Sequence, residues 1–353
     1  MRALRQHGVT LVELMVGLSV GLLTTLAITQ VLALAEGQRR SAVTGSAAQV
    51  DGAVAIYALQ RDLQMAGYGL VHNPAALGCP VRAQFSGGAL QQFPLVPAFI
   101  VDGGADGAPD TVAVLSGSRS GASVPLLVTE NHPLTATGFV VRSAFSVAVG
   151  DLLLAVPAAW DSTVNRCTLF AATSVAATAV GHAASAPWNT TLAALLPVTG
   201  YPAQSYLVNL GSMVYRRYAV QADGAALQTQ QLSATTGATT TLAAYAQIVN
   251  LQALYGLDAD ADGVVDTYTA TAPTTAAGWL RVLSLRIAVV ARSAQYEKET
   301  VTPDSPTWSV RLLPTDAAPT RLPFKLSQLA DWQHYRYKVY ETVVPLRNVL
   351  WNS

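Results

Sequence analysis

The sequence predicts an α+β protein in which one long N-terminal helix carries a large β-rich head. Three observations predict this fold class. The first 70 residues contain no proline and hold an apolar run followed by a helical stripe. Beyond Cys79, short apolar runs alternate with Gly, Pro, Asn and Asp, which is typical of strands and turns. With 353 residues, the chain is long enough to bury a large core.

The apolar run covers residues 9–35, and Glu13 is the only formally charged side chain in it. A helix of this length can span a bilayer. Arg2 and Arg5 precede the run, so the positive-inside rule keeps the N-terminus in the cytoplasm. We therefore interpret residues 9–35 as the membrane-spanning or filament-core half of the helix. An uncleaved signal anchor is the simpler alternative.

Glu13 is hard to reconcile with a simple anchor. A carboxylate at the centre of a spanning helix costs about 2.5–3.5 kcal/mol, and less near the interface. Such a side chain usually has a partner of opposite charge. A cut just before the apolar run would create an α-amino group nearby, and the small residue Gly8 stands at that position.

The helix is expected to continue through residues 36–70 and to end near Gly67. One helical stripe of apolar side chains indicates the face that supports the head; it consists of Ile56, Leu59, Leu63 and Ala66. Arg61 and Asp62 lie off this stripe and are expected on a solvated face.

Residues 71–353 are expected to form the head. The runs that predict strands are "DTVAVLS", "VPLLVTE", "GFVVRS", "DLLLAV", "SMVYRRYAVQ", "WLRVLSLRIAVVARS" and "YRYKVYETVVPLRN". In the sixth run the alternation of polar and apolar residues slips near Ser284. Residues 180–200 are expected to be a long loop or insertion.

The chain has two cysteines, Cys79 and Cys167, and they do not form a CxxC pair. In an exported chain two thiols predict one disulfide. Closing a loop of about 90 residues would stabilise the fold by about 4–5 kcal/mol in the chain-entropy model. Two unrelated buried thiols are the alternative.

Composition and motifs argue against two classes of function. Charged residues make up 12% of the chain, and the 21 basic residues balance the 21 acidic ones. A dedicated nucleic-acid partner is therefore not expected, because such binding needs a basic patch. The sequence holds no HExxH motif and no phosphate-binding glycine loop, so we predict that the protein is not an enzyme. Its five histidines are scattered: His7, His72, His132, His182 and His334.

The stretch "DADADGVVDTY" predicts a calcium loop. It offers five candidate oxygen ligands: Asp258, Asp260, Asp262, the carbonyl of Val264, and Asp266. Ca²⁺ prefers six to eight oxygens, and Gly263 permits the sharp turn of an EF-hand-like loop. Thr269 stands where an EF-hand has a bidentate glutamate, and the residues that follow the loop read as strand. The alternative is an acidic solvated turn.

The N-terminal stretch "GVTLVELMVGLSVGLL" resembles the type III signal of type IV prepilins. The resemblance implies that residues 1–8 are a leader, and that a membrane peptidase cuts between Gly8 and Val9 and methylates Val9. Glu13 is then the fifth mature residue, which in this family pairs with the N-terminal amine of a neighbouring subunit. Val9 stands where most members have phenylalanine.

Three further stretches resemble the PilW-like group of minor pilins: "QRDLQMAGYG", "LYGLDADADGVVDTY" and "YRYKVYETVVPLRN". The resemblance implies a non-enzymatic protein that assembles with other minor pilins and the major pilin, in a priming complex near the pilus tip beneath a PilY-type adhesin. It also implies a single-pass inner-membrane protein with a periplasmic head that later enters the extracellular pilus, with roles in adhesion and twitching motility. A minor pseudopilin of type II secretion and a membrane-anchored surface adhesin are the alternatives. Residues from about 100 to 205 resemble no known family.

Overall fold

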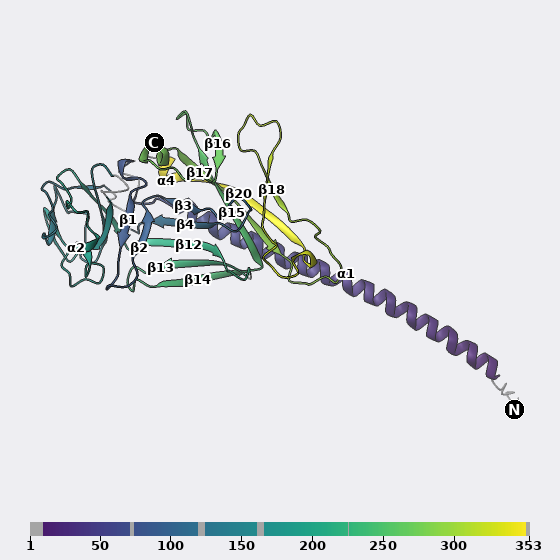
Figure 1. Ribbon diagram of the computed structural model, residues 1–353. Helices are drawn as coiled ribbons and strands as arrows, with labels where there is room; N and C mark the ends of the chain where they lie inside the picture. Colours follow the sequence, from purple (N-terminus) through teal and green to yellow (C-terminus); the bar gives the residue numbers. More distant parts are fainter. Residues whose placement is uncertain (1–9, 71–73, 119–123, 161–165, 225, 351–353) are drawn as a thin grey trace, which may run out of the picture.

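The computed structural model describes residues 10–70, 74–118, 124–160, 166–224 and 226–350. One helix projects from the molecule like a stalk, and its second half enters a head built of several sheets (Figure 1). The α+β fold class and the order of its parts are as the sequence predicts.

The long helix α1 spans Leu11–Met65, 55 residues. At 1.5 Å per residue it is about 80 Å long. It ends where the chain turns at Gly67, whose φ of 77° suits glycine and whose N–H donates to the carbonyl of Leu115 in the head. The predicted end of the helix near Gly67 is thus confirmed. The other helical turns are short: η1 (Pro74–Ala76), α2 (Leu192–Leu195), α3 (Ala276–Leu280), η2 (Trp332–His334) and α4 (Arg347–Leu350).

Five sheets make up the described part of the head. The six-stranded sheet has the order β2-β1-β8-β7-β11-β5, with β1 (Pro80–Ala83), β2 (Gln91–Pro94), β5 (Leu126–Leu127), β7 (Leu152–Val156), β8 (Cys167–Ala171) and β11 (Tyr206–Gly211). A three-stranded sheet, β6-β10-β9, comprises β6 (Gly138–Val140), β9 (Ser174–Ala176) and β10 (Ala179–Gly181).

Three further sheets complete the described part of the head. The five-stranded sheet, β14-β13-β12-β4-β3, comprises β3 (Ala98–Val101), β4 (Thr111–Ser116), β12 (Val214–Val220), β13 (Ala226–Leu232) and β14 (Thr239–Ala246). The four-stranded sheet, β16-β15-β17-β20, comprises β15 (Ile248–Leu257), β16 (Thr267–Thr269), β17 (Val282–Arg292) and β20 (Tyr337–Pro345). The two-stranded sheet pairs β18 (Thr307–Val310) with β19 (Thr320–Pro323).

The four-stranded sheet is covered on both faces. Alternate residues of β17, among them Ile287 and Val289, join the main core with α1, whereas Ala288 and Val290 join a second cluster with β18. The alternation of residues in the sequence of β17 therefore does not separate buried from solvent-exposed positions. Other elements of the chain pack on each face of the sheet, so both sets of residues are buried. The predicted slip near Ser284 is confirmed as a register shift in the pairing of β15 with β17.

Helix α1 crosses β20 at very close range. A Cβ atom on Gly52 would lie 2.4 Å from the ring of Tyr340, so only glycine lets the helix and this strand approach so closely. The predicted stripe is confirmed on this side of the helix, where Leu59, Leu63 and Ala66 are fully buried.

The end of the head farthest from the N-terminus has a core of its own (Figure 1). We call it the distal lobe; its core includes Leu126, Phe139, Phe170, Leu192, Tyr201 and Leu207. It is built from the stretch that resembles no known family. Residues 180–200, expected to be a loop, also contain the single turn α2, and the strand expected from "VPLLVTE" shortens to the two residues of β5.

Candidate functional site

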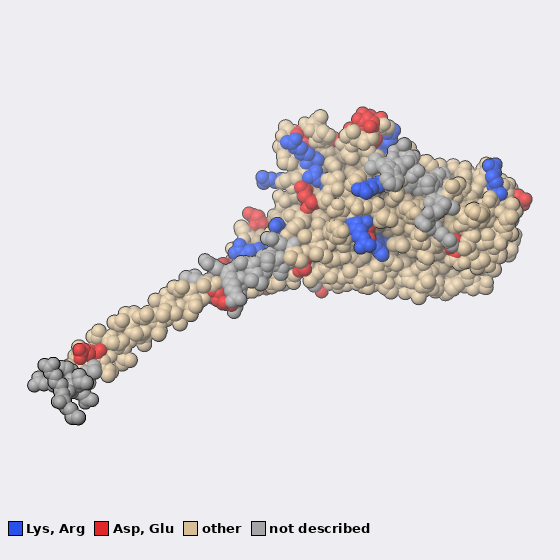
Figure 2. Space-filling view, turned by 180° about the vertical axis from the view of Figure 1, so that it is seen from behind, with Lys and Arg blue, Asp and Glu red and all other residues tan. Residues whose placement is uncertain are grey.

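The first half of α1 presents an apolar surface that no other part of the described chain covers. Residues Leu11–Leu32 form a helix of 22 residues with a mean hydropathy of 2.1, and none of it is buried. Figure 2 shows this stalk almost free of charged side chains. An apolar surface of this size is unfavourable in water, because each large apolar side chain gains about 1.5–3 kcal/mol on burial. One N-terminal apolar helix of this kind fits a single-pass membrane anchor.

The hydroxyl side chains of this segment bond to the helix itself. The hydroxyls of Ser19, Thr24, Thr25 and Thr29 donate to backbone carbonyls three or four residues earlier, at 2.6–2.9 Å. A segment surrounded by lipid or by apolar helices must satisfy its polar groups internally. These hydroxyls therefore add little to the cost of burying the stalk.

Glu13 caps the N-terminus of its own helix. Its Oε2 accepts hydrogen bonds from the N–H and the hydroxyl of Thr10, both at 3.0 Å, while its own N–H donates to the Thr10 hydroxyl at 3.3 Å. This capping box satisfies two orphan groups of the first turn, and the helix dipole favours a carboxylate there. Gly8 and Val9, the expected cleavage site, lie outside the described residues. The pairing of Glu13 with a neighbour's amine therefore stays a prediction.

The second half of α1 is apolar on two faces. One face lies in the core of the head, where Ala55, Leu59 and Leu63 have no exposed surface. Large apolar side chains also stand on the opposite, solvent-facing side; they are Val50, Val54, Tyr57 and Met65, each about half exposed or more. A second exposed apolar surface therefore lies on the part of α1 that packs against the head.

A charged network fastens this half of the helix to β12. The guanidinium Nη1 of Arg216 donates to both carboxylate oxygens of Asp62, at 2.8 and 2.9 Å, and the hydroxyl of Tyr218 donates to Oδ2 at 2.7 Å. The expectation that Asp62 faces solvent is therefore wrong, because β12 supplies a cation and a hydroxyl over it. Arg61 is exposed, as expected.

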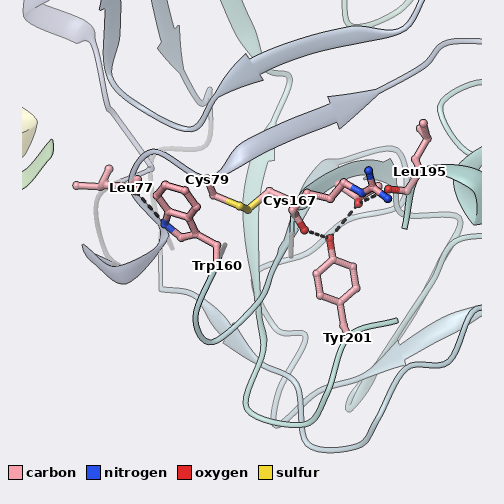
Figure 3. The surroundings of a disulfide bond; sticks show 8 residues. Leu77, Cys79, Trp160, Cys167, Leu195 and Tyr201 are labelled. Atoms are coloured by element: carbon pink, nitrogen blue, oxygen red, sulfur yellow. Dashed lines mark hydrogen bonds between the residues drawn. A yellow bond between two sulfur atoms is a disulfide. The ribbon is translucent and has the colours of Figure 1, made fainter. Parts of the chain in front are cut away.

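Cys79 and Cys167 form a disulfide, as the sequence predicts (Figure 3). Their Cα atoms lie 5.9 Å apart, and both side chains are fully buried. The bond links the start of β1 to the start of β8 across 88 residues. Both cysteines lie in the main core, so the bond ties the segment that follows α1 to β8, the strand whose Phe170 lies in the core of the distal lobe.

Hydrogen bonds on both sides of the disulfide hold the same junction. The indole N–H of Trp160 donates to the carbonyl of Leu77 at 3.1 Å, and the hydroxyl of Tyr201 bonds to the carbonyl of Arg166 and the hydroxyl of Thr168 (Figure 3). Burial raises the pKa of Tyr201, so its hydroxyl stays a neutral donor.

The acidic loop between β15 and β16 brings three of its four carboxylates together. One oxygen from each of Asp258, Asp260 and Asp262 lies within 4.8 Å of the others, and this group does not include Asp266. Asp266 instead accepts from the N–H of Ala259 at 2.6 Å. The chain continues into the strand β16, which contains Thr269, as expected.

Backbone N–H groups wrap around Asp258. Its Oδ1 accepts from Ala261 at 2.6 Å and from Asp262 at 3.3 Å, and its Oδ2 accepts from Gly263 at 3.0 Å. Burial opposes ionisation of Asp258, but these donors outweigh it and lower the pKa of the carboxyl. Each carboxylate oxygen has two lone pairs, so these bonds leave acceptor capacity for a hard cation. The three grouped aspartates therefore fit the ligand chemistry of Ca²⁺.

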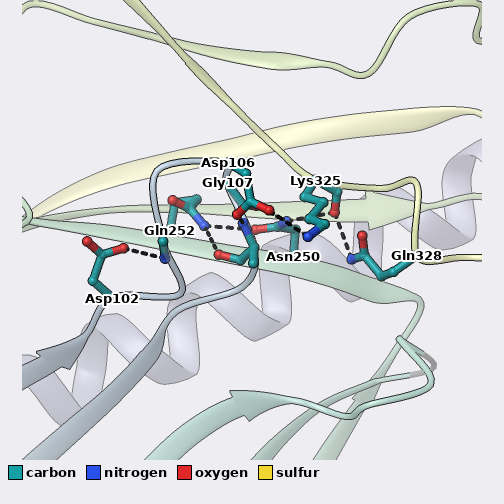
Figure 4. A network of polar contacts seen from close by, with 9 residues as sticks. Asp102, Asp106, Gly107, Asn250, Gln252, Lys325 and Gln328 are labelled. Carbon is teal, nitrogen blue, oxygen red and sulfur yellow. Dashed lines mark hydrogen bonds and ion pairs between the residues drawn. The ribbon is translucent and has the colours of Figure 1, made fainter.

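A second polar cluster, which sequence reasoning missed, is structural. Buried Asn250 donates to the carbonyls of Gly107 and Lys325, and Gln252 donates to the carbonyl of Ala108 (Figure 4). Lys325 also pairs with Asp106 at 2.5 Å. These bonds join the loop after β3 to the segment after β19, some 220 residues later. No local sequence pattern predicts such a cluster, because its partners come from three segments that are far apart in the sequence.

Comparison with known proteins finds a family match in the C-terminal part of the chain. Residues 217–348 match the family model described as Type IV Pilus-assembly protein W. This confirms the resemblance to the PilW-like group over that region and supports a role related to type IV pili. No curated protein matches the chain. Among solved structures, a type IV-like pilin from Thermus thermophilus, TTHA1219, is similar with a TM-score of 0.34 and 11% identity, covering 85% of this chain and 96% of that chain.

Proposed function

We propose that this protein is a minor pilin that takes part in type IV pilus assembly, in a priming complex at the pilus tip. A prepilin peptidase cuts the chain between Gly8 and Val9 and methylates Val9. Before assembly the stalk spans the inner membrane with the head in the periplasm, and afterwards the protein is part of the extracellular pilus. Its partners are other minor pilins, the major pilin and a PilY-type adhesin.

The exposed apolar helix is the observation that carries this proposal. It is continuous with a helix that the head already grips, so the same element can leave lipid and pack among other helices without unfolding the head. Its hydroxyls bond to carbonyls of the same helix, so they require no partner in either environment. The family match over residues 217–348 adds that the head is of a pilus-assembly type.

Glu13 has a specific part in the proposal. In the single chain its carboxylate caps its own helix through Thr10. In the assembled complex it pairs with the Val9 amine of a neighbouring subunit, which sets the axial position of one helix against the next. Alanine at this position removes a polar group from the membrane segment, so insertion into the membrane is not expected to suffer.

Deletion of the gene, followed by complementation, tests the function. We expect few surface pili in the deletion strain, recovery with the wild-type gene and with the matched control Ser19→Ala, and no recovery with Glu13→Ala. Mass spectrometry of the mature protein should find methylated Val9 as its first residue; an intact Met1 would contradict the proposed cleavage. Normal pili with lost type II secretion would favour a pseudopilin, and normal pili with lost surface attachment would favour an adhesin.

We also propose that Ca²⁺ binds the acidic loop and orders it. The proximity of Asp258, Asp260 and Asp262 supports this, because three carboxylates so close together repel one another without a cation. Val264 through its carbonyl and Asp266, directly or through water, are the further ligands expected from the sequence. Lacking a glutamate at Thr269, the loop should bind with an affinity of about 10⁻⁴–10⁻³ M.

A further inference from the structure

Two buried histidines, 50 residues apart in the sequence, meet in the distal lobe. The Nε2 atoms of His132 and His182 lie 2.7 Å apart, and the side chains are 2% and 6% exposed. His132 lies in the loop between β5 and β6 and pairs through its backbone with Tyr201. His182 directly follows β10, and its N–H donates to the carbonyl of Thr137 in that same loop.

The contact has the geometry of a hydrogen bond between two imidazoles. The ring centroids are 4.9 Å apart, so the two Nε2 atoms lie close to the line that joins the rings and point at each other. A metal ion held by both nitrogens would need about 2.0–2.1 Å to each, off that line, and would push them farther apart than 2.7 Å. One ring must therefore donate its N–H while the other accepts, so the accepting ring is neutral.

Among the described residues, the elements packed around the two rings offer no negative charge to balance an added proton. The ring of His132 stacks on Phe139 at 3.8 Å, and His182 meets the edge of Phe170 at 5.6 Å. The adjacent strands β6, β8 and β10 carry no ionisable side chain besides the bonded Cys167. Tyr201 holds its hydroxyl toward other partners, and Glu130, on the same loop as His132, is exposed.

We propose that His132 and His182 form an acid-sensitive latch within the distal lobe, which fastens the loop of residues 129–137 to the end of β10 and releases it in acid. Backbone bonds also tie this loop to its neighbours, from Thr129 to Val140 and between His132 and Tyr201, and the ring contact adds a bond between side chains to them. Nδ1 of His132 is buried and has no hydrogen-bond partner in the described part of the chain. Full protonation of both rings would place two cations and two facing donors at the contact and break it.

The direction of the pH dependence follows from burial. Burial, with the neighbouring His182, lowers the pKa of His132 to about 4, and burial lowers the pKa of His182 as well. Once released, each imidazole returns to about 6.5. The released state therefore binds more protons between these values, so the latch is fully stable above pH 6.5 and weakens as the pH falls toward 4. From pH 7 to pH 5, His132 alone should raise the opening equilibrium constant about 20-fold.

Amide hydrogen exchange on the full-length protein in detergent micelles tests the latch. Exchange is measured at pH 7.5 and pH 5.0, corrected for the intrinsic rate, with peptides of β17 as an internal reference. We expect peptides covering residues 129–141 and 174–184 to lose at least 20-fold in protection at pH 5.0, while β17 does not. Unchanged protection of these peptides at pH 5.0 would overturn the proposal.

Variants separate the latch from general acid sensitivity. The double variant His132→Gln/His182→Gln keeps two side chains that can hydrogen-bond but cannot titrate, so its protection should not depend on pH. The control His334→Gln removes a histidine outside the lobe and should behave like the wild type. A double variant that still loses protection in acid would count against the latch.

Two measurements on the wild-type protein keep the test independent of how the variants fold. Imidazole proton resonances followed by NMR should show two histidines with a pKa lowered from the usual 6.5, and two ordinary titrations would overturn the proposal. Added Zn²⁺ at pH 7.5 should leave the protection of the lobe unchanged. Protection that rises with Zn²⁺ would make the pair a metal site instead of a latch.

Discussion

Both halves of α1 carry large apolar side chains, but only the second half buries some of them within the described chain. In the second half, Leu59 and Leu63 are fully buried by the head of the same chain. In the first half, Leu22 is 70% exposed, and none of residues Leu11–Leu32 is buried. The second half is therefore part of a folding unit, whereas the first half needs lipid or other subunits. One continuous helix can therefore stabilise the fold of the head through one half and provide a contact surface for lipid or other subunits through the other half.

The largest expected effect concerns the disulfide of the head, the part of the molecule that buries the second half of α1. The double variant Cys79→Ala/Cys167→Ala should lower the free energy of unfolding of the head by about 4–5 kcal/mol, because the bond closes a long loop in the unfolded chain. Denaturant unfolding in micelles, followed by near-UV circular dichroism, measures it. Membrane insertion of the stalk should not change. A variant with an unaltered midpoint would show that packing alone holds the junction.

A pair of leucine substitutions compares the two halves directly. Leu59→Ala should lower the free energy of unfolding of the head by about 2–5 kcal/mol, since it leaves a cavity in a closed core. The matched change Leu22→Ala, on the exposed half, should alter head stability by less than about 0.5 kcal/mol. The same unfolding assay serves for both. Equal effects of the two substitutions would break the comparison.

Substitution of Asp62 tests how much its bonds to Arg216 and Tyr218 contribute to holding the second half of α1 on the head. Asp62→Asn should lower the free energy of unfolding by about 2 kcal/mol, because the partly buried Arg216 loses its charged partner. Arg61→Gln, on the adjacent exposed position, is the control and should change little. Thermal melts of both variants, read against the wild type, measure the difference. If the two variants have the same melting temperature, β12 holds the helix by apolar contacts alone.

The smallest expected effect concerns a site on the head far from the stalk. Millimolar Ca²⁺ should stabilise the head by about 0.4–1.4 kcal/mol relative to chelator, from RT ln(1 + [L]/Kd) at the affinity expected for this loop. Differential scanning calorimetry of the full chain in micelles measures the shift in melting temperature. Asp258→Ala with Asp260→Ala should abolish the response to calcium. Identical wild-type melts with calcium and with chelator would make the loop an acidic turn.

Features that depend on neighbouring residues could be predicted from the sequence. The length of α1, its buried stripe at Leu59 and Leu63, and the grouping of Asp258, Asp260 and Asp262 follow from periodicity and spacing within a few turns of chain. The disulfide was also predicted, because an exported chain with two cysteines offers one pairing.

The tertiary structure alone decided which residues meet across long separations. Asp62 lies on a helical position that reads as solvated, yet Arg216 covers it from 154 residues away. His132 and His182 read as two isolated histidines, and only the folding of the distal lobe places their rings in contact. Hydropathy and periodicity describe what one segment prefers, whereas these contacts depend on how several segments pack. The sequence by itself therefore determined the helix, its apolar stalk and the acidic loop, and the packing of the head decided the charged fastening, the covered sheet and the histidine pair.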